Sequence, residues 1–169
     1  LEMTRDVANR FHAVFGETFV LPEVKLQDNA QYVLGTDGAK MSKSKNNIIN
    51  VFLPEKKLRK QIMGIATDST PLEDPKDPDT CTVFALYTLI ADSAEVAAMR
   101  KKYQSGGFGY GHAKQALYEA ILERFSDART KFDDFMANPD ALEAQLQKGA
   151  VKARWVAQEV LTRVRKNLG

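Results

Sequence analysis

Apolar residues recur at intervals of three and four positions through most of the second half of the chain, and this spacing limits the possible folds more than any other feature. It is typical of amphipathic α-helices. It predicts helices over residues 83–90, 93–103 and 112–136, and a final helix that follows the break at Asn138-Pro139 and runs to about residue 168. The glycine-rich segment 106–111 separates the second predicted helix from the third. We therefore expect a bundle of about four helices.

Shorter elements precede this bundle. Residues 1–15 have helical apolar spacing. A further helix is predicted to begin at Pro54, since proline is favoured at the first helical position, and to run through Leu58, Ile62 and Ile65. The apolar triplets at residues 19–21 and 32–34 are predicted to be short strands. Two strands cannot by themselves pair and cover a parallel sheet. We therefore predict a mainly α chain that begins with the tail end of a larger α/β domain.

The apolar positions of these helices form the predicted core. On the last helix the inward positions are Leu142, Leu146, Ala153, Val156, Val160 and Val164. The aromatic residues predicted to be buried are Tyr118, Phe125, Phe132, Phe135 and Trp155. Cys81 is predicted to be a small buried group.

The composition excludes several classes of protein. The chain has 169 residues, 44% hydrophobic and 27% charged, which is typical of one globular domain or two small ones. No apolar run approaches the ~18 residues of a membrane span, and no signal-peptide pattern is visible. Because Cys81 is the single cysteine, an internal disulfide and a cysteine zinc cluster are excluded. We expect no metal site and a cytoplasmic location.

Charge is distributed in blocks, although the net charge is only +2. Residues 40–60 contain seven basic side chains and one acid, residues 68–79 five acids and one lysine, and residues 148–166 six basic side chains and one acid. Two positive blocks suit a polyanion that contacts two surfaces. Solvated helix faces have the same pattern, so charge alone leaves both interpretations open.

One segment combines glycine with lysine and serine. Gly35-Thr36-Asp37-Gly38-Ala39 leads directly into Lys40-Met41-Ser42-Lys43-Ser44. Glycine lets the backbone approach a ligand closely, lysine meets phosphate oxygens as a point charge, and serine adds hydroxyl donors. Ligands of open α/β sheets bind at loops that follow strands. The segment suits a polyphosphate, and an ordinary basic surface turn is the alternative that chemistry alone leaves open.

Residues 40–44 read KMSKS, which is the signature of class I aminoacyl-tRNA synthetases. The run TDGAKMSKSKNNIINVF resembles the corresponding loop of the tryptophanyl-tRNA synthetase family. Three further runs resemble the C-terminal region of that family: IMGIATDSTPLEDP, GYGHAKQAL and GAVKARWVAQEVLTRVRKNLG. The resemblance covers the whole chain in the same order, and the tyrosyl-tRNA synthetase family is the nearest alternative.

The resemblance implies an ATP-dependent ligase. Members of the family activate L-tryptophan with ATP and Mg²⁺, transfer the tryptophanyl group to their tRNA, and are homodimers. The ATP-binding residues would then be Lys40, Met41, Ser42, Lys43 and Ser44. Lys40 and Lys43 are the catalytic candidates, because an ammonium group that binds the leaving pyrophosphate better in the transition state accelerates the reaction. Met41 is expected to pack the loop against the body of the protein.

The resemblance also implies a division into domains. Residues 1–65 would be the C-terminal part of a truncated Rossmann-like α/β catalytic domain with the KMSKS loop, and residues 66–169 a helical anticodon-binding domain. Lys148, Lys152 and Arg163 are the candidate tRNA-binding residues, because basic side chains on a helix hold RNA phosphates. A non-catalytic RNA-binding helical module is the alternative function.

A second family signature, His-x-Gly-His, is not in the sequence, whose histidines are His12 and His112. We therefore expect that this chain alone does not form tryptophanyl-adenylate. The residues that select the amino acid are expected upstream of Leu1.

Overall fold

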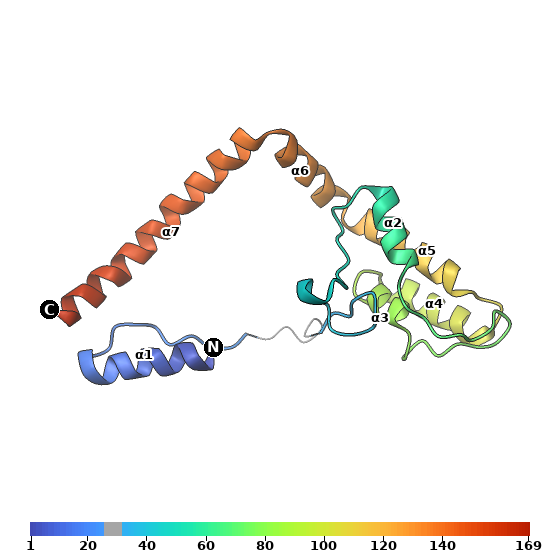
Figure 1. Cartoon of the computed structure of the whole chain (residues 1–169), viewed down its shortest axis with the longest axis horizontal. Coiled ribbons are helices and arrows are strands. Elements are labelled where there is room, and N and C mark those ends of the chain that lie inside the picture. Colours follow the sequence, from blue (N-terminus) through green and yellow to red (C-terminus); the bar gives the residue numbers. More distant parts are fainter. Residues whose placement is uncertain (26–31) are drawn as a thin grey trace. The chain divides into compact units, whose positions relative to one another are not determined.

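The computed structural model describes residues 1–25 and 32–169, which are mainly helical (Figure 1). In chain order the elements are α1 (Glu2–Phe15), the 3₁₀ turn η1 (Lys43–Lys45), α2 (Glu55–Met63), α3 (Thr82–Thr88), α4 (Ser93–Ser105), α5 (Tyr110–Arg124), α6 (Ser126–Ala137) and α7 (Pro139–Leu168). They form two compact units, one of Leu1–Leu26 with Asp134–Gly169 and one of Gln27–Asp133. No helix among the described residues has the length and apolar character needed to span a membrane.

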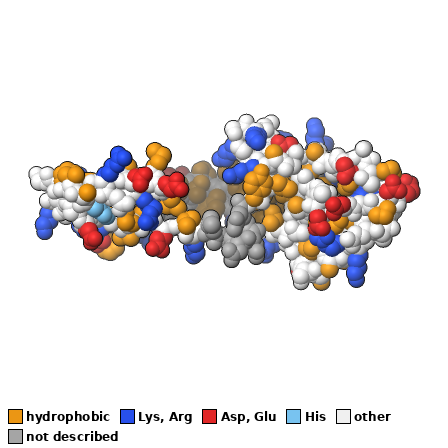
Figure 2. Space-filling view, turned by 90° about the horizontal axis from the view of Figure 1, so that it is seen from below, with side chains coloured by type: hydrophobic (Ala, Val, Ile, Leu, Met, Phe, Trp, Pro, Cys, Tyr) orange, Lys and Arg blue, Asp and Glu red, His pale blue; other side chains and the backbone are white. Residues whose placement is uncertain are grey.

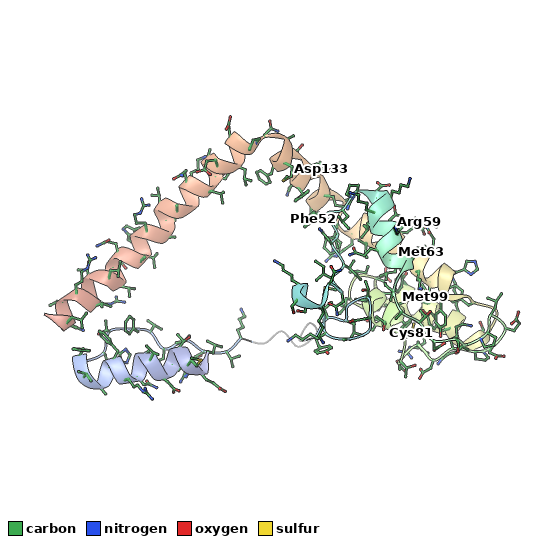
Figure 3. The ribbon with its side chains drawn as sticks, in the orientation of Figure 1. Phe52, Arg59, Met63, Cys81, Met99 and Asp133 are labelled. Atoms are coloured by element: carbon green, nitrogen blue, oxygen red, sulfur yellow. The ribbon has the colours of Figure 1, made fainter. Side chains whose placement is uncertain are left out.

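The second unit is built around α5, which packs on α2 and α3, while α3 also packs on α4. Each of these helices contributes an apolar face to one core, as the predicted spacing requires. The buried residues of that core include Leu58, Ile62, Val83, Phe84, Met99, Tyr103, Leu117 and Ile121. Cys81 and Met99 lie within this unit (Figure 3), and the predicted burial of Cys81 and Tyr118 is confirmed.

Local sequence signals set the ends of α4. At its start the carboxylate of Asp92 accepts from the backbone N–H of Glu95 at 2.8 Å, and the Glu95 carboxylate accepts from the Asp92 N–H at 3.0 Å. This capping box satisfies two backbone donors of the first turn. At its end Gly106 has φ 73°, and a Cβ there would lie 2.3 Å from the carbonyl oxygen of Glu73. Only glycine fits this close turn.

The first unit contains α1, the segment that follows it, and α7. The Asn167 side chain at the end of α7 donates to the Thr18 hydroxyl at 2.7 Å. Phe11 on α1 lies 5.0 Å from Phe19, measured between ring centroids. The helix predicted over residues 1–15 and the final helix predicted to end near Leu168 are confirmed, and the final helix begins at Pro139.

The two predicted strands are wrong for the described residues, where the β pairing is one isolated antiparallel bridge between Leu34 and Lys40. The backbone N–H of Phe19 donates to the His12 side chain at 2.9 Å, and the Pro22 carbonyl accepts from Arg5 at 2.6 Å. These backbone groups therefore bond to side chains of α1 instead of to a neighbouring strand. The mainly α class is confirmed, and the Rossmann-like tail is not.

The helix predicted over residues 112–136 is interrupted at Phe125. This residue has φ −106° and ψ 13°, outside the α-helical region, and it separates α5 from α6. Its side chain lines an apolar pocket of the second unit. The interruption therefore combines a local backbone change with a tertiary contact, neither of which apolar spacing reveals.

Several residues predicted to be buried are exposed. None of the predicted inward residues of α7 is buried, and Trp155 is 67% exposed. Phe132 and Phe135 on α6 are exposed as well. Hydrophobic side chains are visible at the surface among charged ones (Figure 2). Helical spacing identifies the apolar side of a helix, but it does not identify what covers that side.

Leu117 and Leu146 offer a matched test of the core. Leu117 on α5 is completely buried, whereas Leu146 on α7 is 58% exposed. We expect Leu117→Ala to lower the free energy of unfolding of the second unit by about 2–5 kcal/mol, because it leaves a cavity. Leu146→Ala removes the same atoms from an exposed site in the first unit and should change the free energy of unfolding of that unit by less than ~0.5 kcal/mol. Urea denaturation followed by circular dichroism measures both variants, and equal losses would contradict the packing of α5.

Candidate functional site

Backbone hydrogen bonds close the base of the KMSKS loop. The N–H of Met41 donates to the Val33 carbonyl at 2.8 Å, and the N–H of Gly35 donates to the Ala39 carbonyl at 2.7 Å. The loop then continues into η1, which ends at Asn46 with φ 53°. The five motif residues thus lie between a closed turn on one side and a left-handed residue on the other.

The buried side chain of Asn47 joins the parts of this loop. Asn47 is only 2% exposed. Its Oδ1 accepts from the backbone N–H of Ser42 at 2.8 Å, and its Nδ2 donates to the Lys40 carbonyl at 3.1 Å and to Asp37 Oδ1 at 2.7 Å. One amide therefore holds two backbone groups of the motif and one side chain of the preceding turn.

Asp37 completes this network from the turn. Its Oδ1 also accepts from the backbone N–H of Ala39 at 3.0 Å. The hydrogen bond from Asn47, supported by that from Ala39, lowers the pKa of the Asp37 carboxyl below its ordinary value. The carboxylate is therefore ionised at neutral pH. Sequence reasoning missed both residues; Thr36-Asp37-Gly38 is a turn signal that points to Asp37, but no local signal marks Asn47 as buried.

Gly35 is required by this same network. A Cβ at Gly35 would lie 2.4 Å from Asn47 Cγ and 2.6 Å from the Asn47 carbonyl oxygen. The sequence predicted close approach of a glycine backbone to a ligand. In the structure, the group that approaches Gly35 is Asn47.

Lys40 and Lys43 are exposed on the loop. Among the described residues, neither has a carboxylate within 4.0 Å. The hydroxyl groups of Ser42 and Ser44 are hydrogen-bonded to each other at 2.8 Å. Ammonium groups without acidic partners, next to hydroxyls, are suited to bind the oxygens of a polyphosphate.

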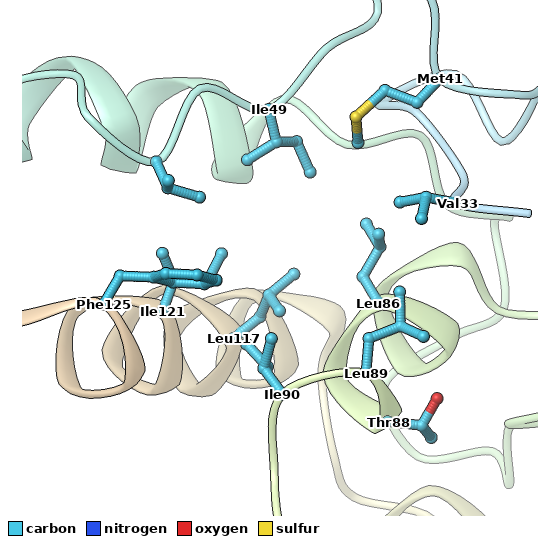
Figure 4. Close-up of a pocket in the computed structure, with 11 residues that line it drawn as sticks. Val33, Met41, Ile49, Leu86, Thr88, Leu89, Ile90, Leu117, Ile121 and Phe125 are labelled. Atoms are coloured by element: carbon cyan, nitrogen blue, oxygen red, sulfur yellow. The ribbon is translucent and has the colours of Figure 1, made fainter. Parts of the chain in front are cut away.

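Met41 lines an apolar pocket of about 560 Å³ between the loop and helices α3 and α5 (Figure 4). Val33 and Ile49 lie on the loop side with Met41, and Leu86 and Leu117 lie on the helix side. The thioether is therefore directed toward the helical core, while the lysines on either side of it are exposed. Met41 and the side chains of α3 and α5 thus face the same apolar pocket.

Lys148, Lys152 and Arg163 lie on α7, in the other compact unit from the loop. All three are exposed. Lys152 and Arg163 are separated by only about 20° around the helix axis at 3.6 residues per turn. Together with Lys148, one turn earlier, they form a basic stripe along the helix. The described residues contain no group of three or more His, Cys, Asp or Glu side chains placed to hold a metal ion.

The family model described as tRNA synthetases class I (W and Y) matches residues 1–126. A tryptophan–tRNA ligase of Rhodopirellula baltica is 50% identical over 169 residues, which are 100% of this chain and 53% of the relative. The corresponding ligase of Campylobacter jejuni is 42% identical with the same coverage of both proteins. The chain thus spans about half the length of these relatives.

A solved structure has the same fold over nearly the whole chain. It is tryptophanyl-tRNA synthetase from Campylobacter jejuni, complexed with ADP and tryptophan, with a TM-score of 0.86 and 42% identity. The match covers 99% of this chain and 53% of that chain.

Asn47→Ala tests the loop network. The variant leaves the N–H of Ser42 and the carbonyl of Lys40 without their partner, so we expect the free energy of unfolding to fall by about 1–3 kcal/mol. The Ser42 amide should also exchange its hydrogen faster, which NMR measures residue by residue.

Gln104→Ala, an exposed change on α4, is the control and should alter neither quantity. Unchanged exchange at Ser42 in Asn47→Ala would show that the buried amide does not hold the loop.

Proposed function

Because the chain belongs to the class I tRNA synthetase family of the tryptophan and tyrosine enzymes, we propose that it is part of a tryptophan–tRNA ligase. The protein that contains it activates L-tryptophan with ATP and transfers the tryptophanyl group to its tRNA. Relatives that match the whole chain are tryptophan–tRNA ligases, which supports tryptophan over tyrosine as the amino acid.

The observation that carries this proposal is the complete KMSKS loop with two lysines that have no acidic partner among the described residues. In the activation step the tryptophan carboxylate attacks the α-phosphorus of ATP, and the bond from that phosphorus to the pyrophosphate oxygen breaks. Negative charge accumulates on the leaving pyrophosphate. Lys40 and Lys43 donate hydrogen bonds to it, and Lys43 contributes most in the transition state.

The rest of the loop serves these two side chains. Ser42 and Ser44 position the loop or donate to phosphate oxygens. Asn47 and Asp37 hold the backbone that carries the lysines, so that little rearrangement is needed when the charge develops. Met41 faces the apolar pocket beside the helical core, which orients the loop toward the body of the protein. Closure of the loop over ATP is then a gating motion.

Mg²⁺ would bind at this site together with ATP. Asp37, the carboxylate nearest to the motif in sequence, is engaged by Asn47 and by the Ala39 N–H. Mg²⁺ is often held by substrate phosphates and water instead of a dedicated protein cage, and this mode agrees with the residues present. The ion neutralises phosphate charge when it is bound.

We assign residues 1–65 to the C-terminal part of the catalytic domain and residues 66–169 to the anticodon-binding domain, so that the chain is the C-terminal portion of the ligase. Lys148, Lys152 and Arg163 then contact the tRNA. The compact units do not follow this boundary, because α2 packs on α5; the division is functional. The parent enzyme is proposed to be a cytoplasmic homodimer.

Lys43→Ala in the full-length ligase that contains this chain tests the role of the loop. We expect the rate of tryptophan-dependent ATP–pyrophosphate exchange to fall about a hundredfold, or about 2.7 kcal/mol, which is the loss of one transition-state donor. Lys45→Ala, a neighbouring exposed lysine outside the motif, is the matched control and should retain most of the rate. An unchanged rate in Lys43→Ala would remove Lys43 from this role.

The chain alone provides a second test. Since it lacks the His-x-Gly-His signature, purified chain is expected to show no tryptophan-dependent exchange above background. Exchange above background would contradict this expectation. The alternative, a non-catalytic RNA-binding module, predicts that the full-length parent protein shows no exchange activity even without a substitution.

A further inference from the structure

A basic hollow lies beside the loop, between its turn and α2. It has a volume of about 340 Å³. It is lined by Thr36, Asn46, Lys57, Lys60, Gln61 and Gly64. None of the five motif residues lines it. The hollow is therefore separate from the ammonium groups that we assign to ATP.

The two lysines lie on the outer side of α2. Leu58 and Ile62 bury the opposite side of this helix in the core. Arg59, labelled in Figure 3, is directed to α5, where its Nε donates to Gln115 at 3.2 Å. Lys57 and Lys60 are three residues apart and thus neighbours on the helix surface. Helix packing therefore directs one basic residue toward α5 and leaves these two at the hollow.

The hollow carries positive charge that nothing nearby neutralises. None of its lining residues is acidic, and among the described residues neither Lys57 nor Lys60 has a carboxylate within 4.0 Å. The side chain of Gln61 is held in place on one side of the hollow. Its Nε2 donates to the Ile48 carbonyl at 2.6 Å, and its Oε1 accepts from the Asn50 N–H at 3.1 Å.

Thr36 and Asn46, whose side chains carry a hydroxyl and an amide, also line the hollow. Thr36 lies in the turn before the motif, and Asn46 ends η1 after it. Two ammonium groups with two neutral donors and no carboxylate are a donor set for a phosphate group.

We propose that this hollow binds a backbone phosphate of the tRNA, and this rests on the proposed function, which supplies the RNA. Recognition is through the ribose-phosphate backbone and therefore does not depend on base sequence. Because Thr36 and Asn46 flank the motif, a phosphate held here contacts the same turn that carries the ATP-binding lysines. The bound tRNA thus fixes the position of the loop relative to α2.

The test uses the 169-residue chain and a fluorescent transcript of tryptophan tRNA, titrated between about 50 and 200 mM salt. Lys57→Gln/Lys60→Gln is expected to weaken binding about tenfold and to lower the slope of log affinity against log salt by about one, because the two lysines together neutralise one phosphate. Lys101→Gln/Lys131→Gln removes the same charge from exposed positions elsewhere in the second unit and should leave the slope unchanged.

Three results would overturn the proposal. The first is an equal loss of affinity in the control, which would show that only net charge matters. The second is that inorganic pyrophosphate at low concentration abolishes the difference in tRNA affinity between Lys57→Gln/Lys60→Gln and the unchanged chain. This would show that the hollow takes free phosphate. The third is no binding of tRNA by the chain. None of these results decides the proposed function, which the Lys43→Ala exchange rate tests separately.

Discussion

The buried amide of Asn47 is the interaction on which the candidate site depends. A buried amide without partners is costly, and here both ends of the side chain are satisfied by the loop itself. Three hydrogen bonds join Ser42, Lys40 and Asp37 to one side chain. The lysines extend into solvent, so their position is set by the backbone below them. The residue that holds this backbone, Asn47, lies outside the motif.

The loop also depends on the helices. After Asn47 the chain runs to α2, and side chains of α2 and α6 form hydrogen bonds with the backbone of this stretch. Gln61 on α2 binds the Ile48 carbonyl, and the Arg129 guanidinium on α6 donates to the carbonyls of Val51 and Leu53. Phe52 stacks on Phe132 with ring centroids 4.7 Å apart. A segment that connects two proposed functional domains is therefore packed as part of one compact unit.

The sequence predicted local features well because the physics behind them is local. Helical spacing located the helices of the second unit, and the glycine at position 106 marked a turn that only glycine fits. Features that depend on distant residues were not predictable. The strand at residues 19–21 needs a partner, and the break at Phe125 comes with a tertiary contact. The KMSKS residues were found by their pattern, but Asn47 was not, because its burial follows from the folded loop.

The acidic segment between the two basic blocks illustrates how charge in the sequence relates to charge in the fold. Lys76, the single lysine of that segment, is buried, and its ammonium donates to the carbonyls of Pro71 and Asp74 at 2.7 and 3.1 Å. Asp79 is paired with Arg100, whose hydrogen bonds lower the pKa of the Asp79 carboxyl. These contacts lie within the acidic segment or between it and α4, and none reaches the lysines of α2 or of the loop. In the part of the chain that the structure describes, no lysine or arginine of residues 40–60 has a carboxylate within 4.0 Å. A surface with such unpaired positive charge suits a polyanion.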